Sequence, residues 1–600
     1  MAVQFIFGGS GRGKTYFLQH KIMEEAVNNP KKDYIMIVPE QFTMQTQKDM
    51  IKISPGHGIM NIDVQSFVRL AFRVFSETGA GNLPVLDDLG KIMILKKVLG
   101  QKKDELKYFG RNINKDGYIS EIKSFMSELI QYGADEDEIE RMIKASEKKP
   151  VLKYKLQDMS VAFKSFKEYI EKNYITSEEL LSVFADVVSQ SELLKGAVIC
   201  LDGFTGFTPL QYRLLRELIK TAEMVYVTVT ADDRESVINK GKNYQLFFMS
   251  RKTVHNIRQI ASETGVEVLD DIWTGKEISQ TRFGESEELE WLERNLFRYP
   301  YKRYNKKNEV SDISCHVLKY AEDEVDFVVQ KIKGLLVGGC RYRDIAIVAG
   351  SLETYGSIIE HSMKKAGIAC FVDQKRGVQS SVPVRAIDAL LQIIIKDFAY
   401  EDVMDYLKSC LSWTSDSQND ILDNYLLATG IRGFKSWNRE WNTAYAYRRM
   451  TDESKDFANG VVENVRLGVL ENLSELYEKT AKGKHTVREY AASLFEFFER
   501  RHFYEKLMEF ADEYEENENF DMASEYRQLY GMVIEVFEKL VSLMGDEEMS
   551  LKEFKDILDV GFSEARIGVI PPGIDQVMAG DMSRTRISNI KYLFLVGANS

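Results

Sequence analysis

The sequence predicts an α/β fold in which two parallel sheets are each interrupted by a helical insertion. Three observations predict it. A buried strand at residues 3–7 runs through a glycine-rich loop into a helix. Apolar strands return at 197–201 after a long stretch with helical spacing, and a second strand–helix–strand series begins near residue 313. Since 600 residues exceed what one hydrophobic core supports, about three or four domains or subdomains are expected.

The first α/β unit combines two stretches of the chain, because strands and helices alternate on both sides of a helical region. Its expected strands lie at residues 3–7, 34–38, 62–64, 197–201 and 224–229. We predict this unit at 1–85 and 190–297. The charged region between them, 86–189, has helical periodicity and is predicted as an insertion.

The second unit repeats this plan. Its expected strands lie at 313–318, 345–348, 577–578 and 592–596, with a helix at 322–336. We predict the unit at 298–385 and 551–600, with a helical insertion at 386–550. The basic and aromatic tract at 298–307 is interpreted as a linker, with a grip on single-stranded DNA as the alternative. The sequence stops just past an apolar strand, so we expect it to be a piece of a longer protein.

The loop after the first strand has the full G-x-x-x-x-G-K-[ST] pattern of a phosphate-binding loop. Its residues, all predicted to bind nucleotide, are Gly8, Gly9, Ser10, Gly11, Arg12, Gly13, Lys14 and Thr15. Glycines let backbone N–H groups turn toward a polyphosphate, and the following helix presents its positive end to it. Lys14 reaches the β- and γ-phosphates and Thr15 ligates Mg²⁺. The alternative is a chance match in a glycine-rich turn.

Asp202 is the second expected Mg²⁺ ligand, because it follows the apolar strand at 197–201, where such sheets bind ligands. The alternative is an ordinary turn aspartate. The next residue, Gly203, has no side chain with which to orient water, although working motors use a glutamate beside the metal-binding acid. No glutamine follows the strand at 224–229, and no arginine finger is evident. We therefore expect nucleotide binding with impaired hydrolysis, and assign no catalytic residue.

Charge and cysteine usage restrict the class of protein. A net charge of −13 argues against a surface that binds nucleic acid everywhere, but allows a local basic channel. The seven histidines contain no H-x-x-x-H pair that would support zinc hydrolysis. The sequence has no long apolar run and no leader-like start, which predicts a cytoplasmic protein without a membrane span. Reduced thiols fit the wide spacing of the five cysteines, Cys200, Cys315, Cys340, Cys370 and Cys410.

Several segments together resemble a known family. They are residues 7–15, 38–43, 64–67, 201–211, and 565–568 through 580–586 to 595–597. In this order the chain resembles the N-terminal part of the AddB family, the B subunits of bacterial AddAB-type helicase–nucleases, which are also called ATP-dependent helicase/deoxyribonucleases. The Asp-Gly-Phe-Thr segment that begins at Asp202 is the most specific, since related helicases of the UvrD type carry Asp-Glu there.

The resemblance implies two P-loop NTPase (RecA-like) lobes of a superfamily 1 helicase-like fold, each with a helical insertion. It implies ATP and Mg²⁺ as ligands and a heterodimer with an AddA-type subunit that carries the working motor. The complex would process double-strand DNA ends for homologous recombination, and AddB itself would scan single-stranded DNA for Chi. By analogy with helicase motifs, Thr43, Ser66 and Phe67 are candidates for contact with the DNA backbone.

Family members also continue into a Mg²⁺-dependent nuclease domain with a four-cysteine 4Fe-4S cluster, for which this sequence has no suitably spaced ligands. Three alternatives remain open for the chain itself. It could be a fully active helicase motor, a P-loop kinase that acts on a small molecule, or a structural adaptor with a vestigial P-loop.

Overall fold

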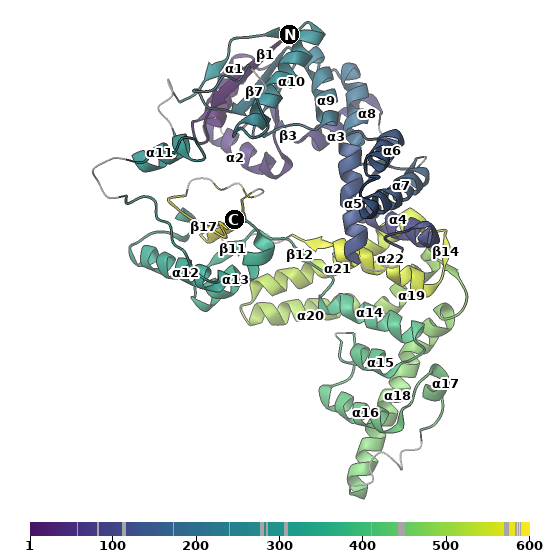
Figure 1. Ribbon diagram of the computed structural model, residues 1–600. Helices are drawn as coiled ribbons and strands as arrows, with labels where there is room; N and C mark the ends of the chain where they lie inside the picture. Colours follow the sequence, from purple (N-terminus) through teal and green to yellow (C-terminus); the bar gives the residue numbers. More distant parts are fainter. Residues whose placement is uncertain are drawn as a thin grey trace.

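The computed structural model contains two sheet units joined by a large helical region (Figure 1). In Figure 1 the first unit lies at the top with the amino terminus, the second at the lower left with the carboxyl terminus, and helices connect them on the right. The structure describes residues 1–599 except 57, 81–82, 111–115, 172, 239–240, 276–280, 284–285, 305–309, 410, 442–450, 569–574, 583–584, 586 and 588–589.

The first sheet is parallel, with strand order β3-β2-β6-β7-β1-β8 and with β9 beside β1. Its strands are β1 (Ala2–Gly8), β2 (Tyr34–Ile37), β3 (Ile62–Gln65), β6 (Val198–Leu201), β7 (Met224–Thr230), β8 (Glu267–Val268) and β9 (Ile272–Trp273). The inner strands β2 and β6 are buried along their whole length, which explains their unbroken apolar runs. All five strands predicted for this unit are confirmed.

Helices cover both faces of the first sheet, and a hydrophobic core lies between the sheet and the helices on each face. One core contains Leu18, Ile22 and Met50 from the helices on one face, and the other contains Leu70, Phe184, Leu214 and Val254 from the helices on the opposite face. These helices are α1 (Lys14–Asn28) and α2 (Thr43–Ile53), then α3 (Phe67–Thr78), α8 (Leu180–Val187), α9 (Pro209–Thr221) and α10 (Phe248–Thr264).

The second sheet is also parallel, with order β11-β16-β10-β17. Its strands are β10 (Ile345–Ala349), β11 (Cys370–Val372), β16 (Val577–Asp581) and β17 (Tyr592–Val596), packed with α12 (Ala321–Val337) and α13 (Leu352–Lys365). The strand predicted at 313–318 is wrong, because that segment forms no strand in the structure. None of its apolar residues is buried, and Val317 is 94% exposed, so the segment lacks the burial that would favour a strand.

The remaining helices form one continuous core rather than two separate insertions. α4 packs against both α22 and α21, so helices from the region before residue 187 and from the region after 382 share buried side chains. Helical periodicity identifies an apolar face but not the element that covers it. The helices are α4 (Asp88–Gln101), α5 (Asp116–Gln131), α6 (Glu136–Ala145), α7 (Pro150–Ile170), α14 (Val382–Ile395), α15 (Tyr400–Leu407), α16 (Asp416–Thr429), α17 (Phe434–Trp437), α18 (Asp452–Thr480), α19 (Val487–Arg500), α20 (Phe503–Glu516), α21 (Phe520–Met544) and α22 (Leu551–Glu564).

Ion pairs reinforce the contact between these helices. Glu564 at the end of α22 accepts hydrogen bonds from Ser120 and Lys123 of α5, at 2.7 and 2.9 Å. Lys539 of α21 pairs with Asp87, the residue that caps α4, at 2.9 Å. The structure therefore places α22, which the sequence assigned to the second sheet unit, within the helical core.

Short elements complete the chain. Two-stranded pairs form between β4 (Val85–Leu86) and β5 (Ile175–Thr176), β12 (Arg376–Gly377) and β15 (Arg566–Ile567), and β13 (His485–Thr486) and β14 (Glu548–Met549). The 3₁₀ turns are η1 (Glu40–Phe42), η2 (Lys103–Glu105), η3 (Val188–Gln190) and η4 (Tyr342–Asp344). Within the described ranges, none of the helices is both long and apolar enough to cross a membrane.

Candidate nucleotide-binding site

A glycine-rich loop joins the carboxyl end of β1 to the amino end of α1. Gly11 and Gly13 have φ values of +72° and +80°, in the left-handed region that side-chain-bearing residues rarely adopt. Gly13 is the N-cap of α1, no side chain caps the helix, and its first turn contains no acidic residue. The positive end of the helix dipole therefore faces the loop without local neutralisation, which suits an anion.

Lys14 lies against the loop that precedes it. Its Nζ donates to the carbonyl oxygens of Gly8 and Gly9, at 3.0 and 2.8 Å. Burial lowers the pKa of Lys14 to about 8, against the opposing attraction of Asp202 and Glu293. Because these carbonyl oxygens are neutral partners, an anionic phosphate oxygen is a stronger acceptor for the same ammonium group.

Thr15 and Asp202, the two predicted Mg²⁺ ligands, lie together. Asp202 Oδ1 accepts hydrogen bonds from Thr15 Oγ1 at 3.1 Å and from Thr228 Oγ1 of β7 at 2.7 Å, and the Asp202 residue is 2% exposed. In the part of the chain that the structure describes, no group of three or more His, Cys, Asp or Glu side chains could hold a metal alone. One hydroxyl and one carboxylate suit a magnesium ion whose other ligands come from phosphate and water.

The position after Asp202 has a backbone that disfavours the missing glutamate. Gly203 has φ +81°, and a Cβ added there would lie 3.5 Å from the Phe42 ring and 3.6 Å from Pro39. A residue with a side chain would be strained at this φ whatever space surrounds it. The absence of a water-orienting group at 203 is therefore part of the local fold.

Asp232, next to the loop at the end of β7, is also a poor candidate for a general base. Ala231 N donates to Gly8 O at 3.1 Å, which places this strand end beside the loop. Burial acts to raise the pKa of Asp232, but hydrogen bonds from Arg234 and the charge of Arg298 outweigh it and hold that pKa well below its usual range. A carboxylate of such low basicity accepts a proton from water poorly.

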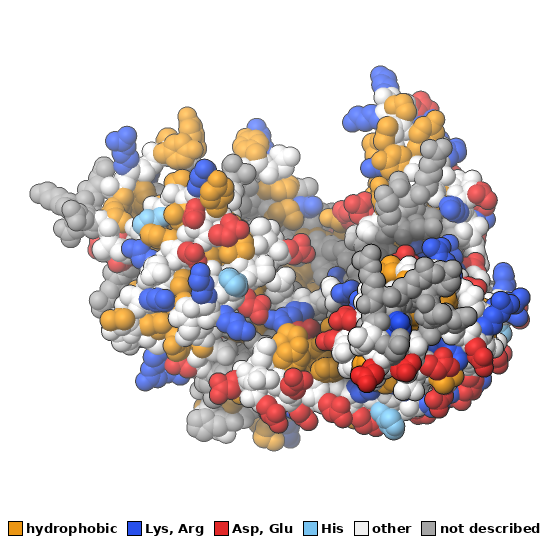
Figure 2. Space-filling view, turned by 90° about the horizontal axis from the view of Figure 1, so that it is seen from below, with side chains coloured by type: hydrophobic (Ala, Val, Ile, Leu, Met, Phe, Trp, Pro, Cys, Tyr) orange, Lys and Arg blue, Asp and Glu red, His pale blue; other side chains and the backbone are white. Residues whose placement is uncertain are grey.

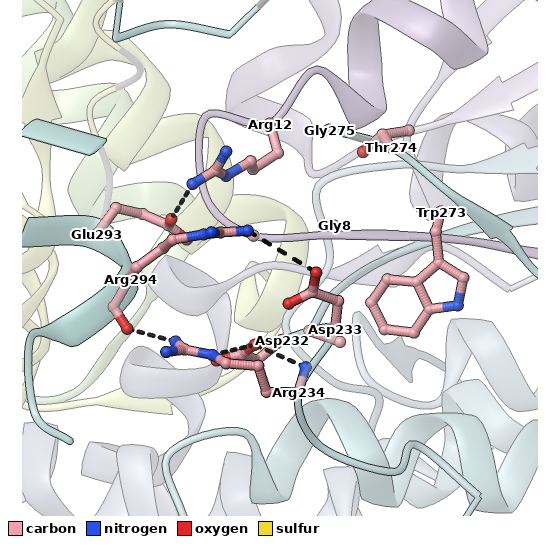
Figure 3. Close-up of a pocket in the computed structure, with 12 residues that line it drawn as sticks. Gly8, Arg12, Asp232, Asp233, Arg234, Trp273, Thr274, Gly275, Glu293 and Arg294 are labelled. Atoms are coloured by element: carbon pink, nitrogen blue, oxygen red, sulfur yellow. Dashed lines mark hydrogen bonds and ion pairs between the residues drawn. The ribbon is translucent and has the colours of Figure 1, made fainter. Parts of the chain in front are cut away.

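The loop also contacts a helix, α11 (Glu287–Asn295), that no sequence pattern connected with the site (Figure 3). Arg12 donates to Glu290 Oε1 at 2.8 Å and to Glu293 Oε2 at 3.1 Å, and both glutamates lie on α11. Beside the loop remains a pocket of only about 30 Å³, lined by Gly8, Gly9 and Glu293 among others. This volume is smaller than the ~300–1,000 Å³ of typical small-molecule sites.

Nothing in the sequence pointed to Glu290 and Glu293. Their segment, Glu-Glu-Leu-Glu-Trp-Leu-Glu-Arg, has the pattern of a solvated charged helix, and it lies far from the loop in sequence. Among the other predicted loop residues, Ser10 is exposed, whereas Arg12 is 7% exposed.

The three candidates for DNA contact lie at the same edge of the first sheet, but their side chains face inward. Thr43, Ser66 and Phe67 are only 4%, 4% and 6% exposed. Thr43 donates to Glu40 O, Ser66 caps α3 by accepting from Arg69 N, and Phe67 packs on other aromatic rings. The Phe67 ring is therefore covered by neighbouring rings, and contact of these three residues with the DNA backbone stays a prediction.

These features define a class of protein. It is an α/β protein with two parallel sheets and many helices, whose first sheet carries a glycine-rich strand–loop–helix connection with a paired threonine and aspartate beside it.

Comparison with known proteins identifies the family. The model described as "ADDB, N-terminal" matches residues 5–293. The B subunit of the ATP-dependent helicase/deoxyribonuclease of Lachnoclostridium phytofermentans is 40% identical over 606 aligned residues, which cover all of this chain and 52% of that relative. Proteins of the same name from Acetivibrio thermocellus and Clostridium novyi are each 32% identical, over 100% of this chain and 52% and 51% of their own lengths. The chain belongs to the AddB family, and it spans about half the length of these curated relatives.

Proposed function

We propose that this chain is the helicase-like, ATP- and DNA-binding part of the B subunit of a heterodimeric helicase–nuclease, and that its own motor is inactive. The names of its relatives, which describe components of an ATP-dependent helicase and deoxyribonuclease, support this function. The single structural observation that carries it is the loop itself, with Lys14 on its backbone and Thr15 paired with Asp202.

In this proposal the two sheets belong to two RecA-like lobes of a superfamily 1 helicase-like fold. The first lobe comprises 1–85 and 190–297 and the second comprises 298–385 and 551–600, with helical insertions at 86–189 and 386–550. Within the last of the lobe segments, α22 packs with the helices of the insertions. Two separate parallel sheets with helices packed against them support the arrangement.

The loop from Gly8 to Thr15 would hold the phosphates of ATP, with Thr15 and Asp202 as ligands of its Mg²⁺. The bound Mg²⁺ would neutralise phosphate charge. The chain's own residues would grip the phosphates without cleaving them, because Gly203 offers no base and the Asp232 carboxylate is paired with arginines. Nucleotide would therefore bias the arrangement of the lobes instead of driving translocation.

We propose an AddA-type subunit and DNA as partners, in a cytoplasmic complex that processes double-strand ends for homologous recombination and recognises Chi. The nuclease and its 4Fe-4S cluster would belong to the parts of such a protein beyond this chain. On the face shown in Figure 2, basic and acidic side chains are interspersed, so DNA contacts would be local. Thr43, Ser66 and Phe67 would shape the sheet edge along which the DNA backbone runs, next to exposed side chains such as Arg69.

Photolabelling with 8-azido-ATP tests nucleotide binding by this chain within the full-length protein, after gel electrophoresis has separated any accompanying subunit. The Lys14→Ala substitution removes a charged hydrogen-bond partner of the phosphates, so the half-saturating concentration should rise by about 10–150-fold. Lys364→Ala, which removes an exposed lysine from α13, is the matched control and should leave labelling unchanged. Unaltered labelling of Lys14→Ala would reject the site.

A further inference from the structure

The two carboxylates of α11 occupy the place where an anion would approach the loop. Glu290 and Glu293 hold Arg12, whose guanidinium also lies 5.3 Å from the centre of the Phe283 ring. A Cβ added to Gly9 would lie 2.2 Å from Glu293 Oε1, so this carboxylate sits directly against the loop backbone. Figure 3 shows Glu293 and Arg12 pointing toward each other beside the loop that contains Gly8.

Polar contacts, rather than a hydrophobic core, hold α11 in this position. None of its nine residues is buried. Besides the two bonds to Arg12, Arg294 pairs with Asp233 at 3.8 Å, and the Arg294 carbonyl accepts a hydrogen bond from Arg234. Because charge-dependent contacts can be replaced by other charged partners, the position of α11 depends on what else binds Arg12.

The helix α11 also contacts the segment that leads into the second sheet unit. The Glu288 carboxylate accepts hydrogen bonds from the backbone N–H groups of Ser311 and Asp312, at 3.0 and 2.9 Å. Just after α11, Arg298 pairs with Asp232 and Glu235. One short helix thus contacts the loop through Glu290 and Glu293, and the path to the second sheet through Glu288.

We propose that α11 is a carboxylate latch, in which Glu290 and Glu293 hold Arg12 and cover Gly9 until the phosphates of a nucleotide replace them. The inference rests on the proposed nucleotide site and adds its regulation. Phosphate and carboxylate are both anions, so they cannot share the same guanidinium and loop amides without repulsion. Binding exchanges the partner of Arg12 and releases α11, and the Glu288 contacts carry this change to the segment that leads into the second sheet.

Glu293→Gln tests the latch, because it keeps the size of the side chain and removes its charge. In 8-azido-ATP labelling of the full-length protein, the half-saturating concentration should fall by about three- to tenfold, as expected for loss of one partly exposed ionic competitor. Glu263→Gln is the matched control. It removes the same charge from an ion pair with Arg216 at the end of α10, near the strand β8 that pairs with the start of β1, away from the loop.

An affinity of Glu293→Gln equal to that of wild type and Glu263→Gln would overturn the latch while leaving the nucleotide site intact. Absence of specific labelling in wild type and in every variant would instead reject the proposed nucleotide site, and the latch with it. The two failures are therefore distinguishable.

Hydrogen exchange provides a second test that needs no variant. Saturating Mg·ATP should speed exchange of the α11 amides in the wild-type protein, because the helix loses its contacts with Arg12. The amides of α10 serve as an internal reference and should not change. Unchanged or slower exchange in α11 would contradict its release.

Discussion

The two sheets contain the same strand–turn–helix arrangement, yet only the first carries the loop that we propose as an anion site. β1 and β10 are both inner strands of parallel sheets, and each is followed by a helix. Residues 9–13, a glycine-rich loop, separate β1 from α1, whereas only Gly350 and Ser351 separate β10 from α13. The short connection leaves no room for a loop that wraps around a phosphate.

Charge at the helix start reinforces this difference. The first turn of α1 contains no acidic residue, whereas the first turn of α13 contains Glu353. A carboxylate there already partners the positive end of the helix dipole and would repel an anion. The order strand–turn–helix therefore does not by itself create a phosphate site. In the proposed site, the longer loop, the left-handed glycines and the unneutralised helix end would provide what the second sheet lacks.

The largest expected difference concerns glycine. Gly13→Ala should destabilise the β1–α1 region by about 1–2 kcal/mol, because alanine is strained at φ +80°. Gly350→Ala is the counterpart in the second sheet. There the φ is outside the left-handed region and an added Cβ meets only Gly597 O at 3.4 Å, so the change should stay within about 0.5 kcal/mol. Native-state hydrogen exchange measures the opening free energy of β1 and β10 separately, and equal effects at the two glycines would break the comparison.

Measuring ATP affinity at several pH values tests the role of the Lys14 charge. Its pKa of about 8 means that the ammonium is charged at pH 7 and mostly neutral at pH 9. The attraction for phosphate is therefore present below this pKa and lost as pH rises through it, so ATP affinity should fall about tenfold between pH 7 and pH 9. Lys14→Arg keeps its charge over this range and should abolish the pH step. A step of the same size in Lys14→Arg would assign it to another group.

The smallest expected effect on ATP binding comes from placing an acidic residue in the first turn of α1, where α13 has Glu353. Tyr16 is in the first turn of α1 and is 41% exposed, so a glutamate there adds charge without disturbing the core. Tyr16→Glu should weaken ATP binding about two- to fivefold relative to Tyr16→Gln, which has a similar shape without the charge. Equal affinities of these two variants, measured by the same labelling titration, would mean that the helix end contributes little.

The local parts of the fold were predictable from the sequence, because short apolar runs bounded by turn residues are typical of buried strands. The strands at β1, β2, β6, β7 and β10 follow the predicted positions. The predicted strand at 313–318 has a similar apolar composition, but none of its side chains is buried in the structure. The packing of α4 against α22 joins residues more than 400 positions apart, and no local pattern specifies such a contact.

The local parts of the candidate site were also predictable from the sequence, whereas its long-range contacts were not. The loop motif and the aspartate after β6 were found from strand context, and the structure brings Thr15 and Asp202 to 3.1 Å. The partners of Arg12 could not be found, because Glu290 and Glu293 lie about 280 residues away in a segment without a motif. The inward orientation of the Phe67 side chain could not be predicted either, because the rings that cover it, Phe204 and Phe207, follow a different strand.

The fate of bound ATP tests the central claim most directly. The full-length protein is incubated with Mg²⁺ and γ-labelled ATP, with and without single-stranded DNA, while any accompanying motor subunit is inactivated in its own phosphate loop. The account predicts stoichiometric retention of intact ATP by this chain, and phosphate release no faster than in Lys14→Ala. DNA-stimulated phosphate release that Lys14→Ala abolishes would contradict it, as would failure to retain ATP.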